Sequence, residues 1–180
     1  MDTIQRVGVI GAGTMGNGIA QACAVKGIPV VMVDVQEAAV LRGLAAVAGS
    51  LDRLVKKDKI AAADKEAALG LIKGSTAYGD LAGCDLVIEA ATENLDLKLR
   101  ILRDVDKLAK PGTLIASNTS SISITALAAV TARPAEFLGV HFFNPVPLMA
   151  LVELVRGLQT SDATVEAAAV FAQRLGKTPI

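Results

Sequence analysis

Short runs of apolar residues recur along the chain, separated by longer stretches in which apolar and polar residues mix. Each run is four or five residues long and is dominated by aliphatic side chains, which is typical of buried strands in a parallel sheet. Strands are predicted over 6–10, 30–33, 85–89, 113–116, 137–140 and 151–155, with a short one at 76–78 and another beginning at Thr178.

The stretches between these runs carry apolar residues at helical spacing. One helix follows the first strand and ends at Gly27, and others are predicted over about 36–57, 63–72, 96–110, 124–130 and 162–175. Alternating strands and helices predict an α/β fold with a doubly wound, mostly parallel sheet and helices on both faces. The two helices between 36 and 72 form a helical-hairpin insertion after the second strand, longer than one crossover requires.

The turn between the first strand and the first helix is a G-x-G-x-x-G motif. Its six residues are Gly11, Ala12, Gly13, Thr14, Met15 and Gly16. In a dinucleotide site, Gly11 permits the tight turn, Gly13 lets a pyrophosphate approach the backbone, and Gly16 lets helix and strand pack closely. The diphosphate then meets the N-terminus of the helix. This order of strand, turn and helix predicts a Rossmann-type dinucleotide-binding fold, although an ordinary βα turn is the alternative.

Asp34 ends the second strand, 23 residues after Gly11, and the dinucleotide fingerprint expects an acidic residue about 20 residues on. Its carboxylate can accept hydrogen bonds from the adenosine ribose hydroxyls, and its charge would repel a ribose phosphate. No Arg or Lys stands at 35–37 to hold such a phosphate. The sequence therefore predicts NAD rather than NADP, unless Asp34 only caps the next helix.

Composition narrows the class of protein. The length of 180 residues fits one domain, or one domain and a fragment of another. Hydrophobic residues make up 52%, but no apolar run approaches the roughly 18 residues of a membrane span. Eighteen basic residues balance eighteen acidic ones and only 3% of residues are aromatic, which disfavours a nucleic-acid partner.

The two cysteines, Cys23 and Cys84, lie in apolar settings without metal-ligand spacing. They indicate reduced core thiols of a cytoplasmic protein, and no metal is expected. Because Val7 already belongs to the first strand, no signal peptide is predicted.

The first arm of the helical hairpin ends in a basic cluster, with Ser50 one turn earlier. The cluster consists of Arg53, Lys56, Lys57 and Lys59. Its spacing alone favours a solvated face, with Asp52 and Asp58 as charge partners, over a ligand site.

Polar residues follow several of the predicted strands, at the edge where doubly wound sheets bind ligands. Glu89 ends one strand, and the polar segment 117–121 follows the next. This segment reads Ser-Asn-Thr-Ser-Ser. Because five small polar residues exceed what one helix cap needs, a ligand role is favoured over a capping loop.

His141 is the only histidine, and it begins the segment His-Phe-Phe-Asn-Pro-Val-Pro after a strand. Twelve residues on, Glu153 interrupts an apolar strand. A buried carboxylate is costly unless it is paired, and a His–carboxylate pair is what a general base requires. From spacing alone, exposure of Glu153 on an edge strand is an equally good interpretation, and a lone His is usually structural.

Together these motifs resemble the short-chain L-3-hydroxyacyl-CoA dehydrogenase family, including bacterial 3-hydroxybutyryl-CoA dehydrogenases. The resemblance covers essentially the whole chain and rests on the segments 11–16, 87–90, 93–94, 117–121 and 141–145. The serine-rich segment and the histidine motif, with Ser120 and His141 separated by 21 residues, are highly specific to this family. The glycine motif is not.

The resemblance implies roles for individual residues. His141 matches the catalytic base and Glu153 the glutamate that orients it. Ser120 matches a serine that contacts the 3-oxygen of the substrate and counts among the cofactor-binding residues, and Asn144 lies near the nicotinamide. Asp34, Glu93 and Lys98 match positions that contact the cofactor. Ser50 and Lys57 match positions that touch coenzyme A. This assignment reverses the solvated-face interpretation of the basic cluster.

The implied reaction is the reversible, NAD-dependent oxidation of L-3-hydroxyacyl-CoA, 3-hydroxybutyryl-CoA in particular, to 3-ketoacyl-CoA in fatty-acid metabolism. Family members continue into an all-helical domain that forms a homodimer. The resemblance therefore implies that residues 1–180 are the NAD-binding domain of a longer protein, with 36–72 as an arm over the acyl-CoA. A cofactor-binding module without turnover and an L-gulonate-type hydroxy-acid dehydrogenase are the alternatives.

Overall fold

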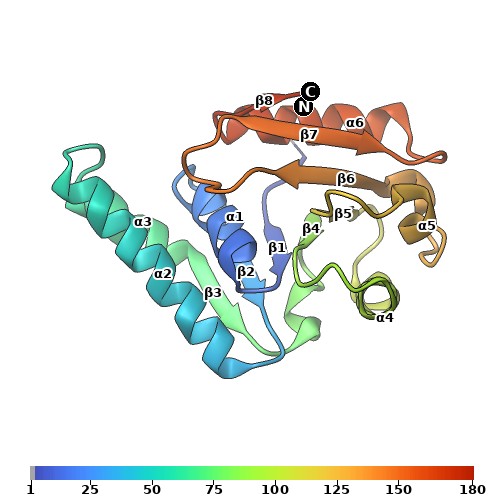
Figure 1. The fold of residues 1–180 in the computed structure, drawn as a ribbon, viewed down its shortest axis with the longest axis horizontal. Coiled ribbons are helices and arrows are strands. Elements are labelled where there is room, and N and C mark those ends of the chain that lie inside the picture. Colours follow the sequence, from blue (N-terminus) through green and yellow to red (C-terminus); the bar gives the residue numbers. More distant parts are fainter. Residues whose placement is uncertain (1–2) are drawn as a thin grey trace.

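A computed structural model describes residues 3–180 as one eight-stranded sheet with helices on both faces (Figure 1). The strands are β1 Val7–Ile10, β2 Val30–Val33, β3 Ile72–Ser75, β4 Leu86–Glu89, β5 Leu114–Ser117, β6 Phe137–Phe142, β7 Leu151–Arg156 and β8 Thr178–Pro179. Their order in the sheet is β3-β2-β1-β4-β5-β6-β7-β8. All neighbours are parallel except β6 and β7, which pair antiparallel.

Within residues 3–180, six α-helices connect the strands. They are α1 Thr14–Ala24, α2 Glu37–Lys56, α3 Ala62–Leu71, α4 Leu95–Leu108, α5 Ile124–Ala128 and α6 Asp162–Arg174. The strand order reverses at β1, which lies between β2 and β4. In doubly wound sheets the ligand crevice lies at this reversal, beyond the carboxyl ends of the strands. The predicted Rossmann-type fold is confirmed.

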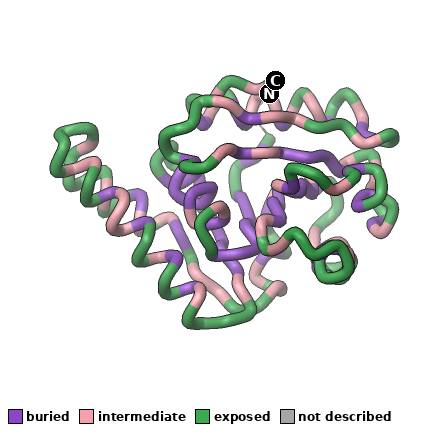
Figure 2. Tube along the Cα trace, in the orientation of Figure 1, coloured by how far each residue is buried: buried purple, intermediate pink, exposed green. Residues whose placement is uncertain are grey.

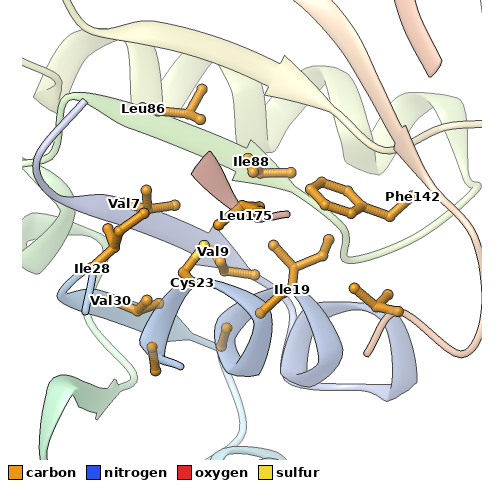
Figure 3. Close-up of a cluster of buried hydrophobic side chains, with 14 of the residues drawn as sticks. Val7, Val9, Ile19, Cys23, Ile28, Val30, Leu86, Ile88, Phe142 and Leu175 are labelled. Carbon is orange, nitrogen blue, oxygen red and sulfur yellow. The ribbon is translucent and has the colours of Figure 1, made fainter. Parts of the chain in front are cut away.

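Two hydrophobic cores fix the sheet between its helical layers. Every residue of β1, β2 and β4 is buried, as expected for strands covered on both faces. On one face α1 and α6 cover the sheet, and Figure 3 shows Ile19 and Cys23 of α1 packed beside Val9 and Phe142. On the other face, α4 and α5 form the second core.

Both cysteines are buried free thiols, as predicted. Burial raises the pKa of Cys23 to about 12 and that of Cys84 to about 11. Since the thiolate is the reactive form, both side chains act as core hydrophobes. Among residues 3–180, the structure contains no group of three His, Cys, Asp or Glu residues that would bind a metal ion, and no helix there is both long and apolar enough to cross a membrane.

The predicted helical hairpin consists of α2 and α3 and projects from the sheet (Figure 1). Its outer part is largely exposed, whereas one side of α2 is buried (Figure 2). At Gly43, α2 approaches the glycine turn closely, because a Cβ there would lie 2.7 Å from the carbonyl oxygen of Ala12. The start of the arm thus forms a wall beside the turn.

The strand predicted at 76–78 is wrong. The chain enters β3 directly after α3, and pairing with β2 buries Ile72. At the end of β3, the Ser75 hydroxyl accepts a hydrogen bond from the Ala77 N–H at 3.0 Å and donates one to Asp80 at 2.6 Å. These bonds turn the chain into a 3₁₀ helix over Tyr78–Leu81. Strand β6 also runs two residues further than predicted, so His141 lies within it.

Candidate active site

The glycine turn lies at the carboxyl end of β1, where its backbone geometry requires glycine at two positions. Gly11 has φ +100°, a conformation that L side chains rarely adopt. A Cβ on Gly16 would lie 1.7 Å from the carbonyl oxygen of Gly11. Gly13 differs, because its φ of −70° is ordinary and a Cβ there would meet nothing within 4 Å. Glycine at 13 therefore leaves open space above the backbone, at the N-terminus of α1.

Asp34 joins this turn to the arm. One carboxylate oxygen accepts a hydrogen bond from the Ala12 N–H and the other from the Gln36 N–H, each at 3.1 Å. The second bond satisfies a donor next to the start of α2, so Asp34 contacts the helix end as well as the glycine turn. Asp34 also lines a cavity of about 350 Å³ together with Gly11, Gly13 and the arm.

Arg42 lines the same cavity, although the sequence prediction considered basic residues only at 35–37. Helical spacing in the sequence places Arg42 on the face of α2 that lines this cavity. Ala39, Gly43 and Ala46 line the cavity too, and residues at these spacings share one face of a helix.

A second cavity of about 310 Å³ continues on the other side of the turn. It shares Gly13, Ala90 and Ala91 with the first, and is also lined by Glu93, Lys98 and Asn118. The two cavities together form a track, here called the dinucleotide track, across the point where the strand order of the sheet reverses. A dinucleotide needs such a track, with its diphosphate over the turn.

Beneath the second cavity lies a buried ion pair. Glu89 is fully buried and Lys98 is 1% exposed. The Lys98 ammonium donates to Glu89 Oε1 and, at 3.3 Å, to the Ser117 hydroxyl, which itself donates to Glu89 at 2.8 Å. The other Glu89 oxygen accepts from the Ala91 N–H at 2.9 Å. The ammonium of Lys98 is thus engaged below the cavity, and the pair holds the strand ends that form its floor.

The serine-rich segment is ordered by its own side chains. Thr119 donates to a Glu93 carboxylate oxygen at 2.9 Å, which brings Glu93 to the segment. Asn118 accepts a hydrogen bond from the Phe142 N–H at 2.8 Å and so fastens the segment to the end of β6. Ser120 lies exposed within it. These bonds explain why the segment is richer in polar residues than one helix cap requires.

His141 and Glu153 lie opposite each other on the antiparallel pair β6 and β7. His141 Nδ1 is 3.7 Å from Glu153 Oε1, an ion-pair distance longer than a hydrogen bond. The side chain of Glu153 is 42% exposed and that of His141 19% exposed. Glu153 is therefore partly exposed rather than buried, and it faces His141, the partner that the sequence indicated.

A third cavity, of about 400 Å³, is a groove between α1, α2 and the loop that follows β6. It contains Ser50 and Lys57 from the arm, which the resemblance places against coenzyme A, and Asn144 from the loop, which the resemblance places near the nicotinamide. Arg53 lines the groove as well, although sequence reasoning counted it only within the basic cluster. Thr14 is shared with the second cavity, so the groove meets the dinucleotide track at the glycine turn.

Residues 6–180 match the sequence profile of the family described as "3-hydroxyacyl-CoA dehydrogenase, NAD binding domain". The chain belongs to this family. Its match to the family's NAD-binding domain makes NAD the cofactor of the site, in agreement with the sequence prediction.

Other members of the dehydrogenase family are similar over nearly the whole chain. A 3-hydroxybutyryl-CoA dehydrogenase of Bradyrhizobium diazoefficiens is 50% identical over 174 residues, which are 97% of this chain and 59% of that protein. The crystal structure of (S)-3-hydroxybutyryl-CoA dehydrogenase PaaH1 from Ralstonia eutropha has a TM-score of 0.97 and 63% identity, covering 99% of this chain and 63% of the other.

A more distant relative, the fatty acid oxidation complex subunit alpha of Pseudomonas putida, is 42% identical over 177 residues, 98% of this chain and 25% of that protein. The chain thus spans about three fifths of the two dehydrogenases and a quarter of this larger subunit.

The open space at Gly13 gives a prediction for this dehydrogenase-family domain. Gly13→Ala is expected to weaken NAD binding at least about tenfold, equivalent to ~1.4 kcal/mol, because the methyl group occupies the space that the diphosphate needs. Stability should change by less than about 0.5 kcal/mol, since the Cβ meets no protein atom within 4 Å. Titration calorimetry and thermal unfolding measure the two quantities.

Gly79→Ala is the matched control, because a Cβ there also meets nothing within 4 Å and lies outside the track. It should leave NAD affinity unchanged. Unchanged NAD affinity in Gly13→Ala would show that the diphosphate does not bind at this position.

Proposed function

We propose that this chain is the NAD-binding and catalytic part of an NAD-dependent L-3-hydroxyacyl-CoA dehydrogenase. One observation carries the proposal. The basic groove shares Thr14 with one cavity of the dinucleotide track and Asn17 and Ala46 with the other, and the neighbouring strands β6 and β7 pair the histidine with a carboxylate. NAD, an acyl thioester of the negatively charged coenzyme A, and a general base would thereby come together at one edge of the sheet.

The residues along the track fit NAD. Asp34 faces the adenosine end and would accept hydrogen bonds from the ribose hydroxyls, while its charge disfavours a ribose phosphate. Gly13 would admit the diphosphate to the N-terminus of α1. Glu93 and Asn144 would contact the nicotinamide half, with Lys98 supporting the floor beneath it. When bound, NAD supplies the hydride acceptor for the reaction.

His141 would act as the proton acceptor. Its Nδ1 faces Glu153, which leaves Nε2 to take the proton from the 3-hydroxyl group of the substrate. The imidazolium that forms is stabilised by the carboxylate of Glu153. Ser120 would hold the 3-oxygen from the exposed side of its segment. In the reverse direction His141 returns the proton.

The basic groove favours an acyl-CoA over a small hydroxy acid, because a free acid has no phosphates for Lys57 and Arg53 to bind. A cofactor-binding module without turnover is the second candidate. The observation in its favour is the separation of 3.7 Å between His141 and Glu153. Catalytic hydrogen bonds are commonly long in the absence of substrate, so we favour the enzyme.

Lys57→Ala tests the groove. The substitution is expected to raise the dissociation constant of acetoacetyl-CoA about fivefold to tenfold, because one charge-assisted phosphate contact is lost. Lys56→Ala is the matched control: it removes the same charge from the adjacent residue, which is not among those that line the groove. NADH affinity should change in neither variant. Equal effects of both substitutions on acetoacetyl-CoA would contradict the groove assignment.

A further inference from the structure

The loop between β6 and β7 forms one wall of the acyl-CoA groove, and most of its shape is local. Asn144, Pro145, Val146, Pro147 and Leu148 all line the groove. The N–H groups of Leu148 and Met149 both donate to the Pro145 carbonyl at 3.0 Å, which folds the loop into a turn. Val146 is buried against α1, where a Cβ on Gly18 would lie 2.9 Å from the Cβ of Val146.

A side chain from a distant part of the sequence also fastens this loop. The Lys177 ammonium donates to the carbonyl oxygens of Val146 and Met149, each at 2.7 Å. The Val146 carbonyl belongs to the turn itself, and the Met149 carbonyl to the residue that closes it. Burial lowers the pKa of Lys177, as expected for an ammonium whose water has been replaced by carbonyl oxygens.

The backbone of Lys177 is itself held firmly. Its N–H donates to the Ala172 carbonyl at 3.0 Å, where α6 ends, and the N–H of Thr178 donates to the Ala150 carbonyl at 2.8 Å. Lys177 therefore stands between the end of α6 and the start of β8, at a fixed position beside the loop. A fixed donor that binds two carbonyls of one turn restricts the turn to one conformation.

We infer that Lys177 is a positioning residue for the acyl-CoA groove: its ammonium holds the 144–149 loop in the conformation that lines the groove. This inference rests on the proposed function of the groove. Lys177 contacts the loop from the side and is not among the groove-lining residues, so it acts through the loop rather than on the ligand. The NAD site depends on this loop only through Asn144.

The test replaces the ammonium by a side chain of similar length without donors, Lys177→Met. Amide hydrogen exchange of Leu148 and Met149 is expected to accelerate at least about tenfold. The dissociation constant of acetoacetyl-CoA should rise by roughly tenfold, and that of NADH by less than about threefold, because the loop supplies only Asn144 to the NAD site. Exchange at Val9 and Ile88, in the central strands, should not change and reports that the fold is intact.

Two further variants separate positioning from a general loss of charge or stability. Lys177→Arg retains donors for both carbonyls and should restore part of the acetoacetyl-CoA affinity. Lys26→Met removes an exposed lysine whose side chain lies near Gly176, and it should change neither the loop amides nor the affinity. Loss of affinity in Lys26→Met equal to that in Lys177→Met would overturn the inference.

These measurements distinguish a failure of the inference about Lys177 from a failure of the proposed function. Unchanged exchange at Leu148 and Met149 in Lys177→Met shows that the ammonium does not hold the loop, and overturns the inference alone. Faster exchange with unchanged acetoacetyl-CoA affinity, while Lys57→Ala still weakens binding, also overturns it and leaves the proposed function standing. A folded wild-type chain that binds NADH but not acetoacetyl-CoA overturns both.

Discussion

His141→Gln is expected to lower turnover of L-3-hydroxybutyryl-CoA by about 10²- to 10⁴-fold, the usual contribution of a general base. Glutamine fills a similar volume but cannot accept the proton of the 3-hydroxyl group. NAD affinity should not change, because the dinucleotide track is formed by other residues. Steady-state NADH formation and calorimetric titration with NAD measure the two effects.

Glu153→Gln provides the comparison. Its effect on turnover should be smaller, because Glu153 lies 3.7 Å from His141 and acts through it. For the same reason the double variant should be no slower than His141→Gln alone, since residues that act as a unit are not additive. Retained turnover in His141→Gln, or additive losses in the double variant, would remove the pair from the mechanism.

Lys98→Met is expected to destabilise the domain by about 3–5 kcal/mol, because it leaves the Glu89 carboxylate buried and uncompensated. Glu89→Gln should have a loss of similar size, since Lys98 is only 1% exposed. The double variant removes both charges, and its loss should be clearly smaller than the sum of the two. Denaturant unfolding of the four proteins completes the cycle.

Lys73→Met is the matched control for this cycle. Lys73 also pairs with a carboxylate, that of Asp80, but its side chain is 59% exposed, and such pairs contribute at most about 1 kcal/mol. A loss below about 1 kcal/mol in Lys98→Met would mean that the buried pair does not stabilise the floor of the cofactor cavity.

The order of the elements was predictable because it depends on local patterns. Apolar runs identified six of the eight strands, the start of β8 was placed at Thr178, and helical spacing identified the hairpin. The exception, β3, directly continues helix α3, and only its pairing with β2 shows that Ile72 belongs to a strand. A pairing between distant segments leaves no local signal.

The candidate site also contains residues that local sequence predicts and residues whose contacts form only between distant segments. The roles of Gly11 and Gly16 follow from the backbone of one turn, and the sequence predicted them. The partners of Glu89 and His141 depend on contacts across the sheet, so spacing left them open. Glu89 ends β4 as predicted, but its burial against Lys98 was not predicted. Lys177 was missed because its loop contacts form only in the folded chain, whereas Arg42 lies on a helix face whose spacing could have indicated it.

The most direct test of the account is NADH formation from L-3-hydroxybutyryl-CoA and NAD. We would measure it in a chimera that continues after Ile180 with the part of the Ralstonia eutropha dehydrogenase beyond the matched segment, because the two chains share a TM-score of 0.97. The account predicts NADH formation that is lost on His141→Gln. A folded chimera that binds NAD and acetoacetyl-CoA but forms no NADH, or one that remains active after His141→Gln, would contradict it.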